Sequence, residues 1–284
     1  MQNIKIGCIG LGLMGRPIAL NLMKAGYSLS AFARRPETLA SLNMTAYSSP
    51  RELASHCDVI ITNVSDTVDV EEVILGTHGI IEGANPASLV IDMSTISPDR
   101  TRHIASELAN KKIDMLDAPV SGGPQGAQSA TLSIMVGGKK AIFDKTLPLL
   151  QTIGQNIVYM GDHGAGQVTK ACNQLVVAQT MTAIAEAFVF AQKSSVSPSK
   201  VREALLGGFA GSRILDVHGQ RMLSGDYTPG FKSKLHQKDL AIVCQEADKL
   251  GIELKGTQLT QEYMNQINDN ELDSSAIFTV ISKD

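Results

Sequence analysis

Over its first 160 residues the chain alternates short apolar segments with segments of helical character. The apolar segments are IKIGCIG, YSLSAFA, CDVIITNV, SLVIDMS, IDMLDAPV, TLSIMVGG and NIVYMG. Their short continuous apolar runs are typical of strands covered on both faces of a parallel sheet. Strand and helix in alternation predict a doubly wound α/β domain.

After Gly161 the pattern changes to helices separated by glycine and proline, and no convincing strand follows. We place the boundary at the segment GDHGAG, which gives domains 1–161 and 162–284, as expected for a chain of 284 residues. The stretch from about Ala165 to Gln192 reads as one helix of roughly 40 Å. Its alanine-rich part has few residues suited to solvent, so we expect it to be the central helix of an all-α domain.

Composition and charge argue against several classes of protein. The net charge of −3 gives no footprint for nucleic acid. No apolar run approaches the length of about 20 residues that a membrane-spanning helix needs, and MQNIKIGCIG carries no signal-peptide pattern. The cysteines Cys8, Cys57, Cys172 and Cys244 are far apart and are expected to be free and buried. These features predict a cytoplasmic protein with neither a nucleic-acid nor a membrane partner.

A glycine-rich turn follows the first predicted strand. It reads Gly10-Leu11-Gly12-Leu13-Met14-Gly15. The spacing G-x-G-x-x-G is weak evidence alone, but here an apolar strand precedes it, a helix follows, and a second strand comes at 28–33. In this context the first glycine permits the tight turn, the second lets the backbone approach a pyrophosphate, and the third allows close helix–strand packing. The turn therefore predicts dinucleotide binding at the helix N-terminus.

The end of the second predicted strand indicates which dinucleotide is bound. An acidic residue about 20 positions beyond the glycines holds the ribose hydroxyls of NAD, whereas arginine accommodates the 2′-phosphate of NADP. This chain has Ala33 at the acidic position, followed by Arg34 and Arg35. Guanidinium groups suit phosphate geometry, so we expect all three residues to contact NADP, with NAD as the alternative cofactor.

Five segments in order resemble the successive motifs of the β-hydroxyacid dehydrogenase family, the group similar to 3-hydroxyisobutyrate dehydrogenase. They are IGLGLMGRPIALNLMKAG, VIDMSTISP, DAPVSGGPQGAQSATLSIMVGG, GAGQVTKACNQ and PGFKSKLHQKDL. The resemblance implies a dinucleotide-binding domain, an all-α domain around the long helix, and an active site in the cleft between them. The segments GGFAGSRILD and DAPVSGG favour the branch that reduces tartronate semialdehyde (2-hydroxy-3-oxopropionate).

Lys170 stands near the start of the long apolar helix, where a lysine is unexpected. Asn173 and Gln174 share its helix face. The helix dipole and partial burial both lower a lysine pKa, which suits a group that exchanges a proton near neutral pH. A structural lysine whose head reaches water is the alternative. The resemblance implies that Lys170 is the catalytic lysine and that Asn173 assists it and the substrate.

Other candidates follow predicted strands, where an α/β sheet places ligands. Ser121, Gly122 and Gly123 offer a hydroxyl and backbone N–H groups to a substrate carboxylate. Thr95 falls within reach of a nicotinamide, whereas Ser97 before Pro98 is a helix cap. A plain loop is the alternative for SGG.

The resemblance adds cofactor contacts at Val64, Ser65 and Lys238, although Lys238 could equally lie in a surface charge pair. His163 and His236 match no catalytic position and are expected to be ordinary polar residues. No residues have metal-ligand spacing, and hydride transfer of this type needs no metal.

The predicted reaction is hydride transfer between NADP(H) and a small β-hydroxyacid or semialdehyde, with reduction of tartronate semialdehyde favoured. Alternatives of the same class are 3-hydroxyisobutyrate dehydrogenase, or a reductase of glyoxylate or succinic semialdehyde. Imine reductases and phosphogluconate dehydrogenases share the two-domain plan, but the former usually lack this lysine and the latter are longer. A catalytically silent NADP-binding module is the non-enzyme alternative. The apolar long helix predicts a homo-oligomer, either a dimer or a tetramer.

Overall fold

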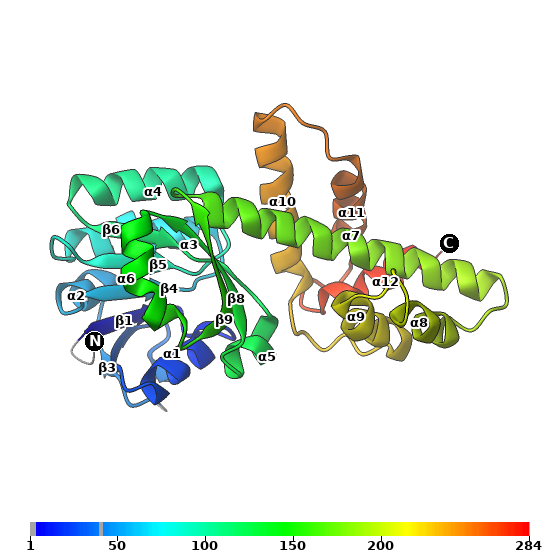
Figure 1. Cartoon of the computed structure of the whole chain (residues 1–284), viewed down its shortest axis with the longest axis horizontal. Helices are drawn as coiled ribbons and strands as arrows, with labels where there is room; N and C mark the ends of the chain where they lie inside the picture. Colours follow the sequence, from blue (N-terminus) through cyan, green and yellow to red (C-terminus); the bar gives the residue numbers. More distant parts are fainter. Residues whose placement is uncertain (1–3, 40–41, 284) are drawn as a thin grey trace. The chain divides into compact units, whose positions relative to one another are not determined.

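The computed structural model describes residues 4–39 and 42–283. The chain divides into two compact units, Met1–Lys170 and Ala171–Asp284. The first unit, coloured blue to green in Figure 1, holds the sheet, and the second, green to red, is helical. The predicted α/β domain followed by an all-helical domain is therefore confirmed. The last described strand ends at Gly161, and the exact domain boundary stays a prediction.

The first unit is built on a mixed sheet whose described strands are mostly parallel. They are β1 (Lys5–Ile9), β2 (Ser28–Phe32), β3 (Thr45–Ala46), β4 (Val59–Thr62), β5 (Leu89–Asp92), β6 (Asp114–Asp117), β7 (Val120–Ser121), β8 (Leu132–Gly138) and β9 (Gly154–Gly161). Their order is β3-β2-β1-β4-β5-β6-β8-β7, with β9 beside β8. Strands β1 to β6 run parallel, and β8 is antiparallel to β6 and β7 but parallel to β9. The short β3 and β7 were not predicted from the sequence.

Helices cover both faces of this sheet, as the continuous apolar strands predicted. They are α1 (Gly15–Lys24), α2 (Pro50–Ser55), α3 (Thr67–Leu75), α4 (Pro98–Asn110), α5 (Gly123–Gln128) and α6 (Lys140–Leu150), with short 3₁₀ turns η1 (Pro36–Leu39) and η2 (Ile80–Glu82). Ile91 and Leu116 pack in one core with residues of α1, α5 and α6. Their neighbours Val90 and Met115 pack in a second core with residues of α2, α3 and α4. The alternation of side chains along each strand therefore supplies two cores, one on each face.

Helix starts in this unit follow local capping rules. Ser97 precedes Pro98 and its hydroxyl accepts the N–H of Arg100 at 3.4 Å, as predicted for α4. By contrast, Met14 precedes α1 and provides no side-chain cap. The first turn of α1 is thus left open toward the glycine-rich turn before it.

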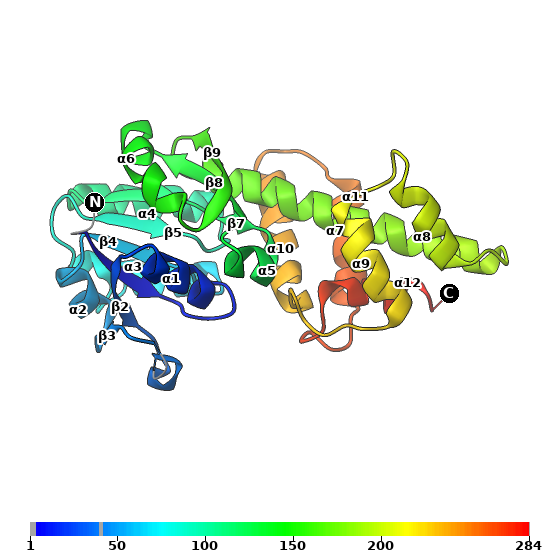
Figure 2. The same cartoon turned by 60° about the horizontal axis from the view of Figure 1, so that its bottom comes forward.

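The second unit contains α-helices packed around the long helix. They are α7 (Ala165–Lys193), α8 (Pro198–Leu206), α9 (Arg213–Ser224), α10 (Ser233–Lys249), α11 (Lys255–Asn265) and α12 (Ile277–Ile281), with a 3₁₀ turn η3 (Ser274–Ala276). Helix α7 begins at the predicted residue, ends one residue later than predicted and starts inside the first unit. Its side chains Met181 and Phe188 pack against Leu240, Met264 and Ile277. Figure 2 shows the other helices of this unit gathered along α7.

One sequence-based expectation about α7 needs correction. By length and composition this helix could cross a membrane, with a mean hydropathy of 1.4 over its most apolar window. The statement that no apolar run approaches that length is therefore wrong for α7. In the protein 44% of that window is buried, and the core helices of soluble proteins meet the same criterion.

The cysteines also differ in part from expectation. All four are free, and Cys8 and Cys57 are buried, but Cys172 is exposed and Cys244 is half-buried. Cys172 lies on α7 opposite the buried stripe of Gln174 and Ala178, because residues two apart on a helix point nearly opposite ways. The expectation that all four are buried was therefore wrong for Cys172.

Candidate functional site

The three glycines of the glycine-rich turn differ in what surrounds them. Gly10 adopts a φ of +90°, and a Cβ added there would meet the Asn63 carbonyl oxygen at 2.1 Å. A Cβ on Gly15 would meet the Gly10 carbonyl oxygen at 2.0 Å. Gly12 has nothing within 4 Å of the same position, so space remains above its backbone. Gly10 and Gly15 are thus needed for close packing, and Gly12 leaves open space where the sequence predicts a pyrophosphate.

The residues between these glycines divide between core and solvent. Leu11 is buried in the core of the first unit and Met14 is half-buried. Leu13 is 60% exposed. The turn therefore presents its backbone and Leu13 outward, where a dinucleotide would pass.

The arginines predicted for the 2′-phosphate directly follow β2. Ala33 is half-buried, and Arg34 and Arg35 are exposed. The Arg34 guanidinium lies 3.2 Å from a carboxylate oxygen of Asp69 in the first turn of α3. The Arg34 guanidinium is therefore paired with a carboxylate and still exposed. Sequence reasoning did not identify Asp69.

The loops after β4 and β5 are joined by hydrogen bonds. The Val64 N–H donates to the Ser94 hydroxyl at 3.0 Å, and the Asn63 amide donates to the Met93 carbonyl at 3.1 Å. Ser65 is exposed, and Thr95 is half-buried. The structure thus brings the predicted contacts Val64, Ser65 and Thr95 to neighbouring loops at the carboxyl end of the sheet.

Lys170 is nearly buried, with 8% of its surface exposed. Its ammonium nitrogen Nζ donates to the Val120 carbonyl oxygen at 2.8 Å. Val120 directly precedes Ser121, Gly122 and Gly123, so the predicted proton donor and the predicted carboxylate loop lie together. A structural lysine whose head reaches water does not describe this geometry.

The loop Ser121–Gly123 has a backbone that only glycine adopts readily. Gly122 has a φ of +130° and Gly123 a φ of +62°. Both glycines are exposed, and nothing lies within 4 Å of an added Cβ on Gly123. The loop therefore offers accessible backbone N–H groups beside the Ser121 side chain.

Two buried aspartates lie beneath these loops and were missed from the sequence. Asp92 and Asp117 end β5 and β6 and are paired in register. Both have no exposed surface, and burial raises the pKa of each carboxyl above its ordinary value. Asp92 accepts the Thr62 hydroxyl at 2.8 Å, and Asp117 accepts backbone N–H groups at the start of α7. A signal was present in the sequence, since an aspartate follows the apolar run within both predicted strands, SLVIDMS and IDMLDAPV.

A second group of predicted residues lies in the helical unit. The Asn173 amide donates to the Gln174 side-chain oxygen at 2.8 Å, and Gln174 donates to the Asp239 carboxylate at 2.5 Å. The Lys238 ammonium lies 2.9 Å from the other Asp239 oxygen. Asn173 and Lys238 are thus connected through Gln174 and Asp239. Gln174 was placed on the lysine face without a role, and the bridging function of Asp239 was missed.

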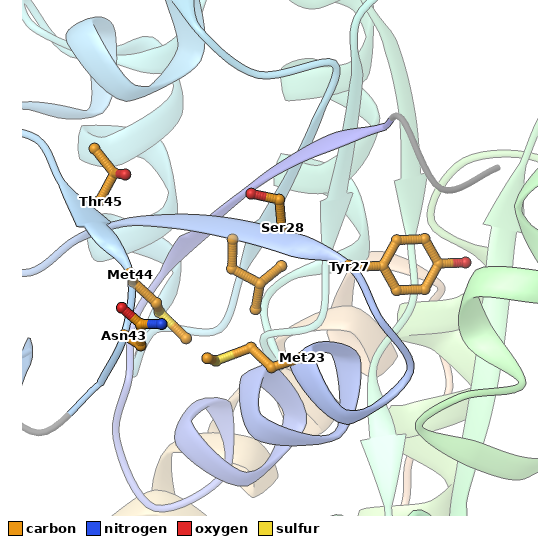
Figure 3. A pocket seen from close by; sticks show the side chains of 7 residues that line it. Met23, Tyr27, Ser28, Asn43, Met44 and Thr45 are labelled. Atoms are coloured by element: carbon orange, nitrogen blue, oxygen red, sulfur yellow. The ribbon is translucent and has the colours of Figure 1, made fainter.

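The two histidines bond backbone carbonyls. His163 bonds the Met115 carbonyl at 3.1 Å, and the buried His236 bonds the Gln174 carbonyl at 3.2 Å. Among the described residues no cluster of His, Cys, Asp or Glu could hold a metal. The cavity of Figure 3, about 430 Å³, is lined by Ser28 and Thr45 at the amino ends of β2 and β3. It lies at the end of these strands away from the glycine-rich turn, and none of its described lining residues is charged.

The first unit combines a glycine-rich turn on a doubly wound sheet with a buried lysine beside a glycine loop. Residues 5–161 match the family described as the NAD binding domain of 6-phosphogluconate dehydrogenase. Residues 164–281 match the family described as NAD-binding of NADP-dependent 3-hydroxyisobutyrate dehydrogenase. The chain is 43% identical over 279 residues to 2-hydroxy-3-oxopropionate reductase of Escherichia coli K12, covering 96% of both proteins.

Solved structures of 3-hydroxyisobutyrate dehydrogenases also match this chain over nearly its full length. A structure of Mycobacterium tuberculosis 3-hydroxyisobutyrate dehydrogenase with L-serine matches with a TM-score of 0.90 and 30% identity, covering 98% of this chain and 99% of that one. A 3-hydroxyisobutyrate dehydrogenase structure from Salmonella typhimurium matches with a TM-score of 0.88 and 28% identity, covering 98% and 100%. The chain belongs to the 3-hydroxyisobutyrate dehydrogenase-like β-hydroxyacid dehydrogenase family and is an NAD(P)-dependent oxidoreductase.

Proposed function

We propose that this protein reduces 2-hydroxy-3-oxopropionate, or a closely similar semialdehyde acid, with NADPH. The observation that carries the proposal is the position of Lys170, whose ammonium bonds Val120 at 2.8 Å directly before the Ser121–Gly123 loop. A proton donor and a carboxylate-binding loop are what a semialdehyde acid requires. The identity of 43% to an enzyme named for this substrate supports the choice within the family.

The residues present fit the cofactor. The open space at Gly12 leaves room for the pyrophosphate. The first turn of α1 has no side-chain cap, so its N–H groups and the helix dipole would stabilise the negative charge of the phosphates. Arg34 is exposed and would exchange its partner Asp69 for the 2′-phosphate. We expect Val64, Ser65 and Thr95 to contact the nicotinamide half of the cofactor, and Lys238 is a further proposed cofactor contact. When bound, the reduced nicotinamide supplies the hydride.

The chain's own groups hold the substrate and move the proton. The Ser121 hydroxyl and the N–H groups of Gly122 and Gly123 bind the carboxylate, with the Asn173 amide as a further donor. The Lys170 ammonium donates a proton to the aldehyde oxygen as that oxygen gains negative charge. In the reverse direction the neutral amine removes the hydroxyl proton. The product of reduction is the 2,3-dihydroxy acid.

Steady-state kinetics on a panel of substrates tests the proposal. The panel contains 2-hydroxy-3-oxopropionate, glyoxylate, succinic semialdehyde and methylmalonate semialdehyde, each with NADPH and NADH. We expect the highest kcat/KM with 2-hydroxy-3-oxopropionate and NADPH. A higher kcat/KM for methylmalonate semialdehyde would instead assign the activity of a 3-hydroxyisobutyrate dehydrogenase. Absence of turnover on all four, with NADPH still bound, would indicate a silent binding module.

A further inference from the structure

Helix α7 carries Lys170, and the first turn of this helix is capped by a carboxylate from the sheet. Asp117 at the end of β6 accepts the Gly164 N–H at 2.9 Å and the Gln167 N–H at 3.1 Å. An added Cβ on Gly166 would meet the Met135 carbonyl oxygen at 2.4 Å and an Asp117 carboxylate oxygen at 2.8 Å. The turn therefore packs directly on the sheet, and the Asp117 carboxylate holds its backbone there.

The Gln167 side chain then connects this turn to the loop after β5. Its amide nitrogen donates to the Ser94 carbonyl at 2.8 Å, and its amide oxygen accepts the Ile96 N–H at 3.2 Å. These two partners flank Thr95, which we propose lies beside the nicotinamide. Gln167 is 1% exposed and satisfies both ends of its amide, so it is held in one orientation.

Lys170 follows Gln167 by three residues, and its ammonium donates to the Val120 carbonyl in β7. One helical turn thus contacts the loops that carry Thr95 and Ser121. We propose that Gln167 is a positioning residue for the proton donor, with Asp117 as its anchor on the sheet. It sets the distance between the Lys170 ammonium and the place where hydride is delivered. This inference rests on the proposed function, because it assigns Gln167 to that reaction.

The proposed role predicts a loss of rate with little loss of binding. A displacement of about 1 Å at a reacting group can cost about 10²-fold. Gln167→Met keeps the volume and removes both hydrogen bonds, so we expect kcat to fall by about 10- to 100-fold. The dissociation constant of NADPH and the substrate KM should change by less than about threefold.

Gln179→Met is the matched control. Gln179 lies on the same helix and its side chain makes one hydrogen bond, to Thr257 at 3.0 Å, away from the loops above. This variant should keep kcat within about twofold of the wild type. Thermal unfolding of both variants shows whether Gln167→Met is folded. If Gln167→Met does not fold, Gln167→Glu takes its place in the kinetic measurements. This side chain has the same length and keeps the oxygen that accepts the Ile96 N–H, and we expect kcat to fall by about tenfold.

A double-mutant cycle separates positioning from a general structural role. If Gln167 acts through Lys170, Gln167→Met should change single-turnover rates by less than about twofold in a Lys170→Met background. Equal losses in both backgrounds would contradict the proposal. So would a kcat within about twofold of wild type for a folded Gln167→Met protein.

A second readout does not require turnover. Acetic anhydride labelling, quantified by mass spectrometry, compares Lys170 with Lys139, whose side chain is 61% exposed. We expect Lys170 to be labelled several-fold faster in Gln167→Met than in wild type or Gln179→Met. Unchanged labelling would overturn the positioning role even for an active enzyme. If the wild type reduces none of the semialdehydes, the proposed function fails while the labelling still decides how Lys170 is held.

Discussion

At the scale of single residues, Arg34 is the side chain that we expect to determine the preference for NADPH over NADH. It is exposed, and its charge faces one carboxylate. Replacing Arg34 with alanine should lower kcat/KM for NADPH by about 10- to 100-fold, the range for losing a charged hydrogen bond. The value for NADH should change by less than about threefold, since NADH has no 2′-phosphate. Initial rates with both cofactors on one substrate measure this. Equal losses for the two cofactors would contradict the assignment.

A substitution of Asp69, the ion-pair partner of Arg34, is the control for the predicted effect of Arg34→Ala. Asp69→Asn removes a competitor for the guanidinium that lies 3.2 Å away. The KM for NADPH should then stay constant or fall. A rise comparable to that of Arg34→Ala would show that Asp69 orients the arginine instead of competing for it.

The conformation of the Ser121–Gly123 loop belongs to the scale of the structural element. Gly122→Ala forces an alanine into a φ of +130°, with its Cβ 3.3 Å from a Leu132 methyl carbon. We expect a loss of about 1–3 kcal/mol in unfolding free energy and a higher substrate KM, with NADPH affinity retained. Denaturant unfolding and steady-state kinetics measure the two effects.

Gly126→Ala is the matched control on α5. Its added Cβ would meet the same Leu132 carbon at 3.4 Å, and Gly126 has no positive φ. This variant should be as stable as wild type or slightly more stable. If it raises KM as much as Gly122→Ala, crowding at Leu132 and not the loop backbone would explain the effect.

A buried carboxylate stabilises the loop before α10. Asp273 has no exposed surface. Its partners are the N–H groups of Gly230, Phe231 and Ser275, the Ser275 hydroxyl, His218 and Arg221. Burial alone would raise the pKa of Asp273, but the nearby His218 and the hydrogen bonds from Ser275 and Phe231 outweigh it and lower the pKa below its ordinary value.

The sign of this shift predicts how stability depends on pH. Because the pKa is lower in the folded protein, the carboxylate stabilises the fold fully above about pH 4, and the contribution is lost as the pH falls below that value. Asp273→Asn should lower the unfolding free energy at pH 7 by on the order of 3 kcal/mol. Denaturant unfolding at pH 7, 4 and 3 should show the difference from wild type narrowing with acidity. A constant difference, or an equal loss for the exposed Asp248→Asn, would contradict this account.

Elements were predicted better than the connections between them. The alternating runs identified the strands of the sheet core, and the apolar stretch predicted α7 to within one residue, because both depend on local periodicity. The roles of Asp117 and Gln167 depend on which strand ends meet the first turn of α7, and β7 depends on pairing with β8. Contacts between segments far apart in the sequence produce no periodic pattern of residues, so sequence patterns do not predict them. The exposure of Cys172 was missed because it depends on which face of α7 is packed.

At the scale of the whole molecule, large apolar side chains remain exposed in the helical unit. Val176 and Phe190 on α7 are 57% and 75% exposed, and Phe209 is fully exposed. Exposed apolar surface of this kind favours association, so we predict a homo-oligomer. Light scattering at micromolar concentration should give a mass at least twice 30.2 kDa. Phe190→Glu should shift the distribution toward monomer, whereas a monomeric wild-type protein would contradict the prediction.

In the proposed mechanism Lys170 transfers the proton, whereas other residues bind the cofactor. Lys170→Met tests this separation of roles most directly. The substitution keeps the apolar stem that the buried site requires and removes the ammonium that bonds Val120. The measurement is kcat for 2-hydroxy-3-oxopropionate reduction together with the NADPH dissociation constant from fluorescence titration. We predict a fall in kcat of at least about 100-fold, with NADPH affinity within about threefold of wild type. A kcat within a few-fold of wild type, or a collapse of NADPH binding along with activity, would contradict the role of Lys170 as proton donor.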